Sequence, residues 1–168
     1  MTASPNSLAE IYRGWDLYQK QLVTIIEPLT AEQLDLRAGP GLRSVREKMA
    51  HVIAVRARWL LLDLKEGAGE MEPYLGWDGW SEDGVRQELP ARSAAELVSG
   101  LQATWSVLQR CLERWTTDDL NDVFPPAYPG EESFTRQYVI WHLIEHDLHH
   151  GGEASIVLGA HGIPALEL

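Results

Sequence analysis

Four long segments of this chain repeat apolar residues at helical spacing, and this repeat restricts the possible folds more than any other feature. The segments cover residues 7–27, 44–65, 93–115 and 134–158. In the third, the apolar positions recur every three or four residues, at Leu97, Leu101, Trp105, Leu108 and Leu112. No stretch alternates apolar and polar residues in the way a half-buried strand does. The sequence therefore predicts an all-α protein.

Residues at the expected helix starts support this prediction. Ser44 and Ser93 are each followed three residues later by a glutamate, Glu47 and Glu96. In such a capping box, the serine and the glutamate satisfy backbone N–H groups that the first turn of a helix leaves unpaired. Thr30 is expected to cap a short helical turn between the first two segments.

Four amphipathic helices of this length bury their apolar faces most economically against one another, which predicts a four-helix bundle. A length of 168 residues suits one domain spanning residues 1–168. The connection at 66–92, between the second and third helices, is long for a compact domain, and such loops are often functional. Trp77 and Trp80 lie in this loop and are expected either to plug the end of the bundle or to wall a pocket.

The charge balance excludes several classes of partner. With a net charge of −11, the chain is unsuited to sequence-independent nucleic-acid binding or to docking on anionic lipid. No segment is apolar for long enough to span a membrane, and the first residues lack the pattern of a secretory signal. Cys111 is the only cysteine and cannot form an internal disulfide, which fits a reducing compartment. We therefore expect a cytoplasmic location.

Polar metal-ligand residues gather on one face of the last expected helix. His142, His146, His149, His150 and Glu153 fall within an arc of about 100° at 3.6 residues per turn. Imidazoles four residues apart stand one turn from each other and can converge on one ion. Two such pairs share His146, and the alternative for this face is a solvated polar surface.

A third metal ligand must come from another helix, and His51 in the second segment is the natural candidate. Three histidines leave a coordination position open, as in catalytic metal sites. The alternative for His51 is a hydrogen-bonded core histidine. The run from His142 to His146 also matches the H-x-x-E-H pattern of inverted zinc peptidases. That interpretation is disfavoured because Glu145 lies about 100° from His146 around the helix.

The segment WHLIEHDLHHGGE at 141–153, together with REKMAHV at 46–52, resembles the DinB/YfiT-like superfamily of metalloenzymes over nearly the whole chain. The resemblance implies a four-helix bundle of unusual connectivity that binds zinc or nickel. By position, its three histidine ligands correspond to His51, His146 and His150. His142 and His149 match family histidines that are not usually ligands, so we expect them to lie around the three ligand histidines without binding the metal.

The resemblance also implies an activity. Characterised members include S-transferases that use bacillithiol or mycothiol, and a mycothiol-dependent maleylpyruvate isomerase; homodimers are common. Where the family often has H-R-G-Q after the last ligand, this chain has His150-Gly-Gly-Glu153. The arginine that could contact an anion is absent, and Glu153 is expected to hydrogen-bond a ligand histidine instead.

These patterns together predict a divalent-metal-dependent enzyme that acts on a small molecule, and the resemblance implies that the metal activates a thiol in a transfer or isomerisation. The alternatives are hydrolysis by metal-activated water, a non-catalytic metal-binding protein linked to stress, and a bundle whose site has decayed. Arg58 lies two turns from His51 on the same face and could contact an anionic cofactor or substrate, although a salt bridge explains it equally well.

Overall fold

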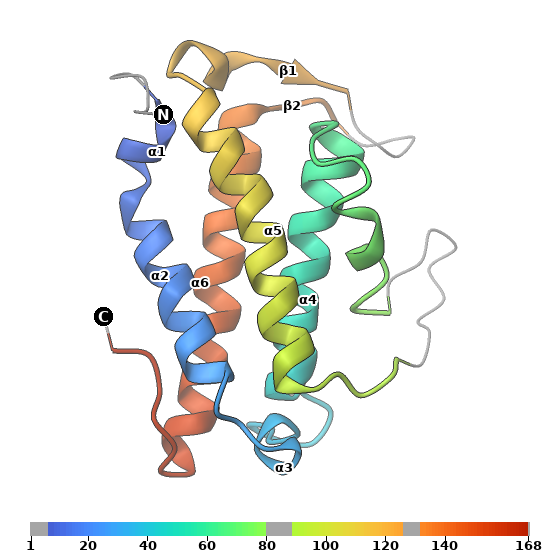
Figure 1. Cartoon of the computed structure of the whole chain (residues 1–168), viewed down its shortest axis with the longest axis vertical. Coiled ribbons are helices and arrows are strands. Elements are labelled where there is room, and N and C mark those ends of the chain that lie inside the picture. Colours follow the sequence, from blue (N-terminus) through green and yellow to red (C-terminus); the bar gives the residue numbers. More distant parts are fainter. Residues whose placement is uncertain (1–6, 80–88, 126–131, 168) are drawn as a thin grey trace.

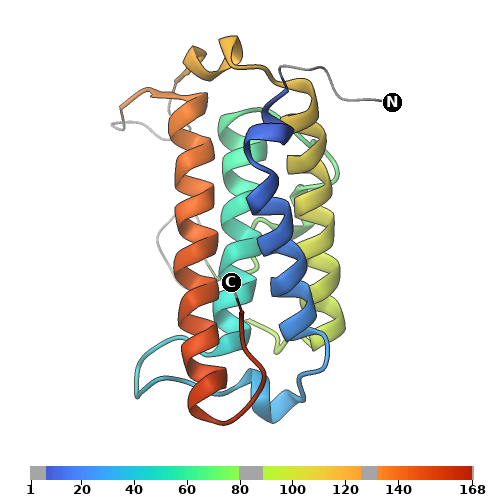
Figure 2. The same cartoon turned by 90° about the vertical axis from the view of Figure 1, so that its left-hand side faces the viewer.

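The computed structural model describes residues 7–79, 89–125 and 132–167, and this part of the chain is mainly helical, as predicted. Its α-helices are α1 (Leu8–Ile11), α2 (Arg13–Ile26), α3 (Ala31–Leu34), α4 (Val45–Arg58), α5 (Ala94–Arg114) and α6 (Arg136–Ala160). The long helices α2, α4, α5 and α6 run side by side (Figures 1 and 2). Between α4 and α6, which carry the predicted ligands, the chain directions are opposite (Figure 1).

The capping predictions are confirmed. Ser44 and Ser93 each accept a hydrogen bond from the backbone N–H of the glutamate three residues on, and that glutamate's side chain returns to the serine backbone. Thr30 and Gln33 make the same reciprocal pair at α3. Each cap contributes about 1 kcal/mol and fixes the residue at which a helix starts.

The prediction of one continuous helix over 7–27 is wrong, because the chain leaves helical geometry at Tyr12, between α1 and α2. Leu8 is fully buried, and its backbone N–H donates to the carbonyl of Trp115 at 2.9 Å. This hydrogen bond ties α1 to the end of α5. Apolar spacing along the sequence carries no trace of such a long-range backbone bond.

Two features at the ends of helices also depart from the prediction. The expected helix at 44–65 finishes as a π-helical turn, Trp59–Asp63. Such turns are rare in proteins as a whole, and those that occur are often found at functional sites. An antiparallel pair joins β1 (Val123–Phe124) to β2 (Phe134–Thr135) before α6 begins (Figure 1). Each strand has two residues, which is too short for an alternating pattern to register in the sequence.

The core surrounds α4, which packs against both α5 and α6. Eleven of the fourteen residues of α4 are buried, and the three exceptions are Glu47, His51 and Arg58. A polar side chain on such a helix therefore lies close to the interior. None of the helices in the described ranges combines the length and the apolar character needed to cross a lipid bilayer.

Candidate metal centre

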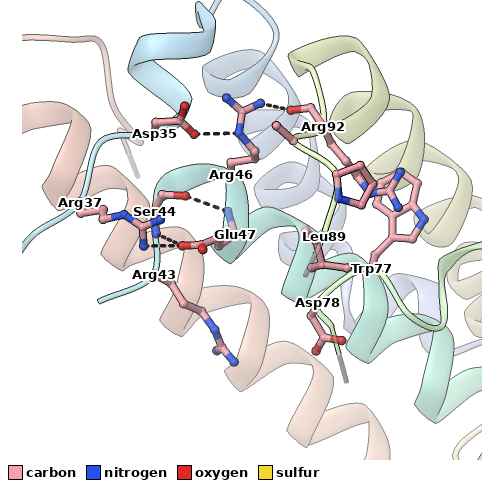
Figure 3. Close-up of a pocket in the computed structure, with 13 residues that line it drawn as sticks. Asp35, Arg37, Arg43, Ser44, Arg46, Glu47, Trp77, Asp78, Leu89 and Arg92 are labelled. Carbon is pink, nitrogen blue, oxygen red and sulfur yellow. Dashed lines mark hydrogen bonds and ion pairs between the residues drawn. The ribbon is translucent and has the colours of Figure 1, made fainter. Parts of the chain in front are cut away.

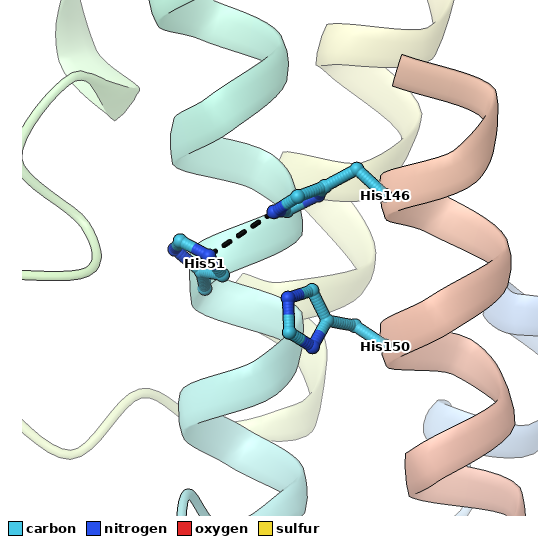
Figure 4. A group of neighbouring side chains, drawn as sticks. All are labelled: His51, His146 and His150. Atoms are coloured by element: carbon cyan, nitrogen blue, oxygen red, sulfur yellow. Dashed lines mark hydrogen bonds between the residues drawn. The ribbon is translucent and has the colours of Figure 1, made fainter. Parts of the chain in front are cut away.

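Three imidazoles converge between α4 and α6 (Figure 4). His51 extends from α4, and His146 and His150 extend from successive turns of α6. One ring nitrogen of each residue lies within 4.8 Å of those of the other two. The ring centroids are 4.6–4.9 Å apart, and Nε2 of His51 lies 3.1 Å from Nε2 of His146.

These distances suit a shared divalent ion. Two nitrogens that bind one zinc ion at about 2.0–2.1 Å with tetrahedral angles lie about 3.3 Å from each other. The 3.1 Å between the facing nitrogens of His51 and His146 is close to that value. Nδ1 of His146 is buried and has no hydrogen-bond partner among the described residues, so the polar contact of this ring is made through Nε2. The donor set therefore fits a metal such as zinc or nickel.

A carboxylate in the long loop orients His51. Asp78 Oδ2 lies 2.7 Å from His51 Nδ1, and both carboxylate oxygens of Asp78 contact the guanidinium of Arg58, at 2.9 and 3.0 Å. A carboxylate held by an arginine accepts hydrogen bonds, so His51 donates from Nδ1 and turns an unprotonated Nε2 towards the cluster. Arg58 thus lies behind Asp78, in the salt-bridged arrangement that was the alternative to an anion contact.

His150 has an equivalent partner on its own helix. Its Nδ1 lies 2.8 Å from Glu153 Oε2, as expected for Glu153, and the same oxygen accepts from Lys48 of α4 at 3.0 Å. Burial acts to raise the pKa of Glu153, but the hydrogen bonds from His150 and Lys48 outweigh it and lower that pKa. An ionised Glu153 fixes the proton of His150 on Nδ1, which leaves Nε2 to face His51 and His146.

The two α6 histidines are held neutral. Burial, assisted by the neighbouring imidazoles, lowers the pKa of His146 to about 2. Burial also lowers the pKa of His150 to about 4, against the opposing hydrogen bond from Glu153. A metal ion binds the neutral form of the ring, so at neutral pH protons do not compete with a cation for these two histidines.

The remaining histidines of the predicted stripe lie outside the convergent set. His142 packs its ring against Trp59 and Tyr138, at centroid distances of 4.9 and 6.2 Å, and burial lowers its pKa. Its ring centroid is 5.9 Å from that of His146. His149 is largely exposed, with Nε2 3.7 Å from Glu153 Oε1. Both therefore border the three-histidine cluster.

A pocket of about 410 Å³ is lined in part by Asp78, the residue that contacts His51 Nδ1 (Figure 3). Asp78 and Trp77 form part of its wall, and the guanidinium of Arg92 lies 3.7 Å from the centre of the Trp77 ring. Its volume lies in the range of small-molecule sites. Trp77 therefore lines a pocket, whereas Trp80 falls outside the described residues. Because Asp78 touches both the pocket and His51, it connects this pocket to the cluster.

Sequence reasoning missed two members of the site. Asp78 was hidden because it lies 27 positions from His51, in a loop whose path periodicity does not predict. The only signal was an acidic residue between two tryptophans in a long, Gly-rich connection. Lys48 was missed because lysine on a helix normally faces water, whereas its side chain here is 4% exposed.

Fold and site together define a mainly helical protein with a histidine cluster suited to a divalent metal. The chain belongs to the DinB superfamily, whose sequence model matches residues 15–154. Among solved structures, a DinB-like protein from Bacillus cereus matches 98% of this chain and 99% of its own, with a TM-score of 0.71 and 15% identity. A DinB-like protein from Bacillus subtilis gives a TM-score of 0.61 with 14% identity, over 95% of this chain and 96% of its own. No curated protein sequence matches the chain.

Proposed function

We propose that the chain is a divalent-metal-dependent enzyme in which His51, His146 and His150 hold the ion, and that its long helices form the superfamily's four-helix bundle with 66–92 as the long connection. The observation that supports the metal site is the convergence of three ring nitrogens within 4.8 Å. Carboxylates behind two of the rings strengthen the case, because Asp78 and Glu153 leave the Nε2 atoms of His51 and His150 free to bind.

A divalent ion at this position supplies a Lewis acid that lowers the pKa of a thiol or of water and so provides a nucleophile near neutral pH. The chain contributes neutral ligands, because burial keeps the His146 and His150 rings uncharged. Three protein ligands leave room for a further group at the ion, which is the arrangement of a catalytic site.

The thiol in this proposal comes from a second molecule. Cys111 is 2% exposed, and burial, with a contribution from Glu66, raises the pKa of its thiol to about 12. A buried thiol with a raised pKa is a poor nucleophile. The superfamily resemblance favours a low-molecular-weight thiol such as bacillithiol or mycothiol, with zinc or nickel as the metal. A small-molecule substrate, a homodimer and a cytoplasmic location complete the proposal.

Metal analysis tests whether the three histidines bind a divalent ion. Protein purified without a histidine tag should hold close to one zinc or nickel ion per chain after loading and dialysis, measured by mass spectrometry of the metal. His146→Ala should abolish this binding. The matched control is His161→Ala, because His161 lies beyond the cluster and its Nδ1 donates to the Val157 carbonyl at 2.8 Å. Absence of stoichiometric metal in the unmodified protein, or equal binding by His146→Ala, contradicts the site.

Thiol dependence separates the competing activities. Electrophilic substrates consumed only in the presence of an added thiol support transfer or isomerisation. Turnover of esters or amides by the metal-loaded protein without thiol supports hydrolysis instead. Stoichiometric metal with neither activity supports the non-catalytic alternative, a metal-binding protein.

A further inference from the structure

A fully buried ion pair joins α4 to α6 next to the histidine cluster. Arg56 and Asp147 both have no exposed side-chain surface. Arg56 Nη2 donates to Asp147 Oδ2 at 2.6 Å, and its Nε lies 3.1 Å from both carboxylate oxygens. Trp15 of α2 donates to Asp147 Oδ2 from its indole nitrogen, also at 2.6 Å. Three helices therefore meet at one carboxylate, and that carboxylate directly follows His146 in the sequence.

Stability alone does not account for such a pair. Removing two charges from water carries a desolvation cost that can exceed their attraction, and well-packed apolar residues are often at least as stable in the same place. An apolar replacement lacks the directional hydrogen bonds that fix how two helices are aligned. The best-attested role of buried polar groups is to select one register among packings of similar energy.

The helices around this pair need such a selection. α4 is buried around nearly its whole circumference. The hydrophobic effect therefore favours burying this helix but does not determine which of its sides faces α6. Three of the buried side chains on that helix, Ala50, Ala54 and Ala57, are too small to interlock with a neighbour. Rotating α4 by one residue, about 100°, would keep most of the apolar contact and turn His51 away from His146.

We propose that Arg56 and Asp147 are positioning residues that set the register of α4 against α6 and thereby bring His51 to His146 and His150. This inference rests on the proposed metal site. A second charged contact joins the same two helices, where Lys48 of α4 donates to Glu153 of α6. On α4, Lys48 and Arg56 lie on either side of His51 in the sequence, and two contacts at different levels fix both the rotation and the translation of one helix against the other.

The test replaces the network by apolar residues of similar size, in the triple variant Arg56→Met, Asp147→Leu, Trp15→Phe. The triple variant should keep a cooperative urea denaturation, since the removed charges are replaced by packing. Its zinc affinity, measured by titration calorimetry with zinc chloride, should fall tenfold or more. The matched control is Arg136→Met, which removes a mostly buried charged contact of α6 with Asp122 and should leave zinc affinity within twofold.

Unchanged zinc affinity in a folded triple variant would overturn the inference. If the triple variant does not fold, Arg56→Lys takes its place, because it keeps the charge but loses the forked contact; unchanged affinity in this variant would likewise overturn the inference. Crystal structures of metal-free proteins give a readout that is independent of metal binding. The His51 and His146 rings should separate by about 1 Å or more in the variant, enough to spoil a ligand set. Failure of the unmodified protein to bind zinc would contradict the proposed function, while the ring separation would still test the register.

Discussion

Asp78 Oδ2 lies 2.7 Å from His51 Nδ1 and joins the long loop to the histidine cluster. Asp78→Ala removes the acceptor that holds the His51 ring and its proton in place. Partners of this kind typically contribute tenfold to a hundredfold to metal affinity, so we expect a loss of about that size in a zinc titration. Asp118→Ala, on the surface-exposed 3₁₀ turn Asp118–Asn121, is the control and should bind zinc as the unmodified protein does. Equal affinities in both variants would show that Asp78 does not support the site.

The stability of the metal-free protein should fall as the pH is lowered. Burial lowers the pKa of His146 to about 2 and that of His150 to about 4, whereas both titrate near 6.5 in an unfolded chain. Below about pH 6.5 the unfolded state therefore binds more protons than the folded state, and the free energy of unfolding decreases. The decrease approaches about 1.4 kcal/mol per pH unit for each histidine.

Urea denaturation at a series of pH values measures this effect. His146→Gln should show a shallower loss of stability towards low pH, because one of the two groups no longer titrates. Gln109→Ala, an exposed substitution on α5 that changes no titratable group, should keep the slope of the unmodified protein. Identical slopes in the unmodified protein and His146→Gln would show that His146 takes up its proton equally in both states.

Two adjacent glycines of α6 should respond in opposite ways to the same substitution. A Cβ at Gly151 would overlap the hydroxyl of Tyr18 and lie 2.9 Å from Leu22 Cδ2, because these side chains of α2 pack against the Gly151 backbone. Gly151→Ala should cost about 1–3 kcal/mol of stability through this overpacking. A Cβ at Gly152 meets nothing within 4 Å, so Gly152→Ala should stabilise the helix by up to about 1 kcal/mol. Thermal denaturation checks both, and equal effects would contradict the close contact.

Cys111 should be inert in the folded protein. Its thiol is buried on α5, and burial raises its pKa to about 12, so the reactive thiolate is scarce. Alkylation by iodoacetamide at neutral pH, followed by mass spectrometry, should be at least tenfold slower in native protein than in urea. Activity with an added thiol should also survive Cys111→Ala, provided the variant folds. Rapid native labelling would contradict the assignment of the thiol to a second molecule.

Local signals in the sequence were sufficient for the helical class and for several helix starts. Capping depends on residues three positions apart, so Ser44 with Glu47 and Ser93 with Glu96 could be recognised without any tertiary information. The same holds for His146 and His150, because a spacing of four residues places two side chains on one face of any helix. His51 was a candidate because it lies within the second apolar segment, the superfamily resemblance supported it, and the structure places its ring beside the other two.

Only the tertiary structure decided what surrounds those rings. The partnership of Asp78 with His51 depends on the path of a loop, and the buried contact of Arg56 with Asp147 depends on how two helices are aligned. Neither the loop path nor the helix alignment follows from apolar spacing, because apolar residues are buried in many helix registers. Hydrogen bonds between distant residues are directional and form in only one register. The sequence by itself thus determined which helices form and which imidazoles share a face, and directional long-range contacts decided how they meet.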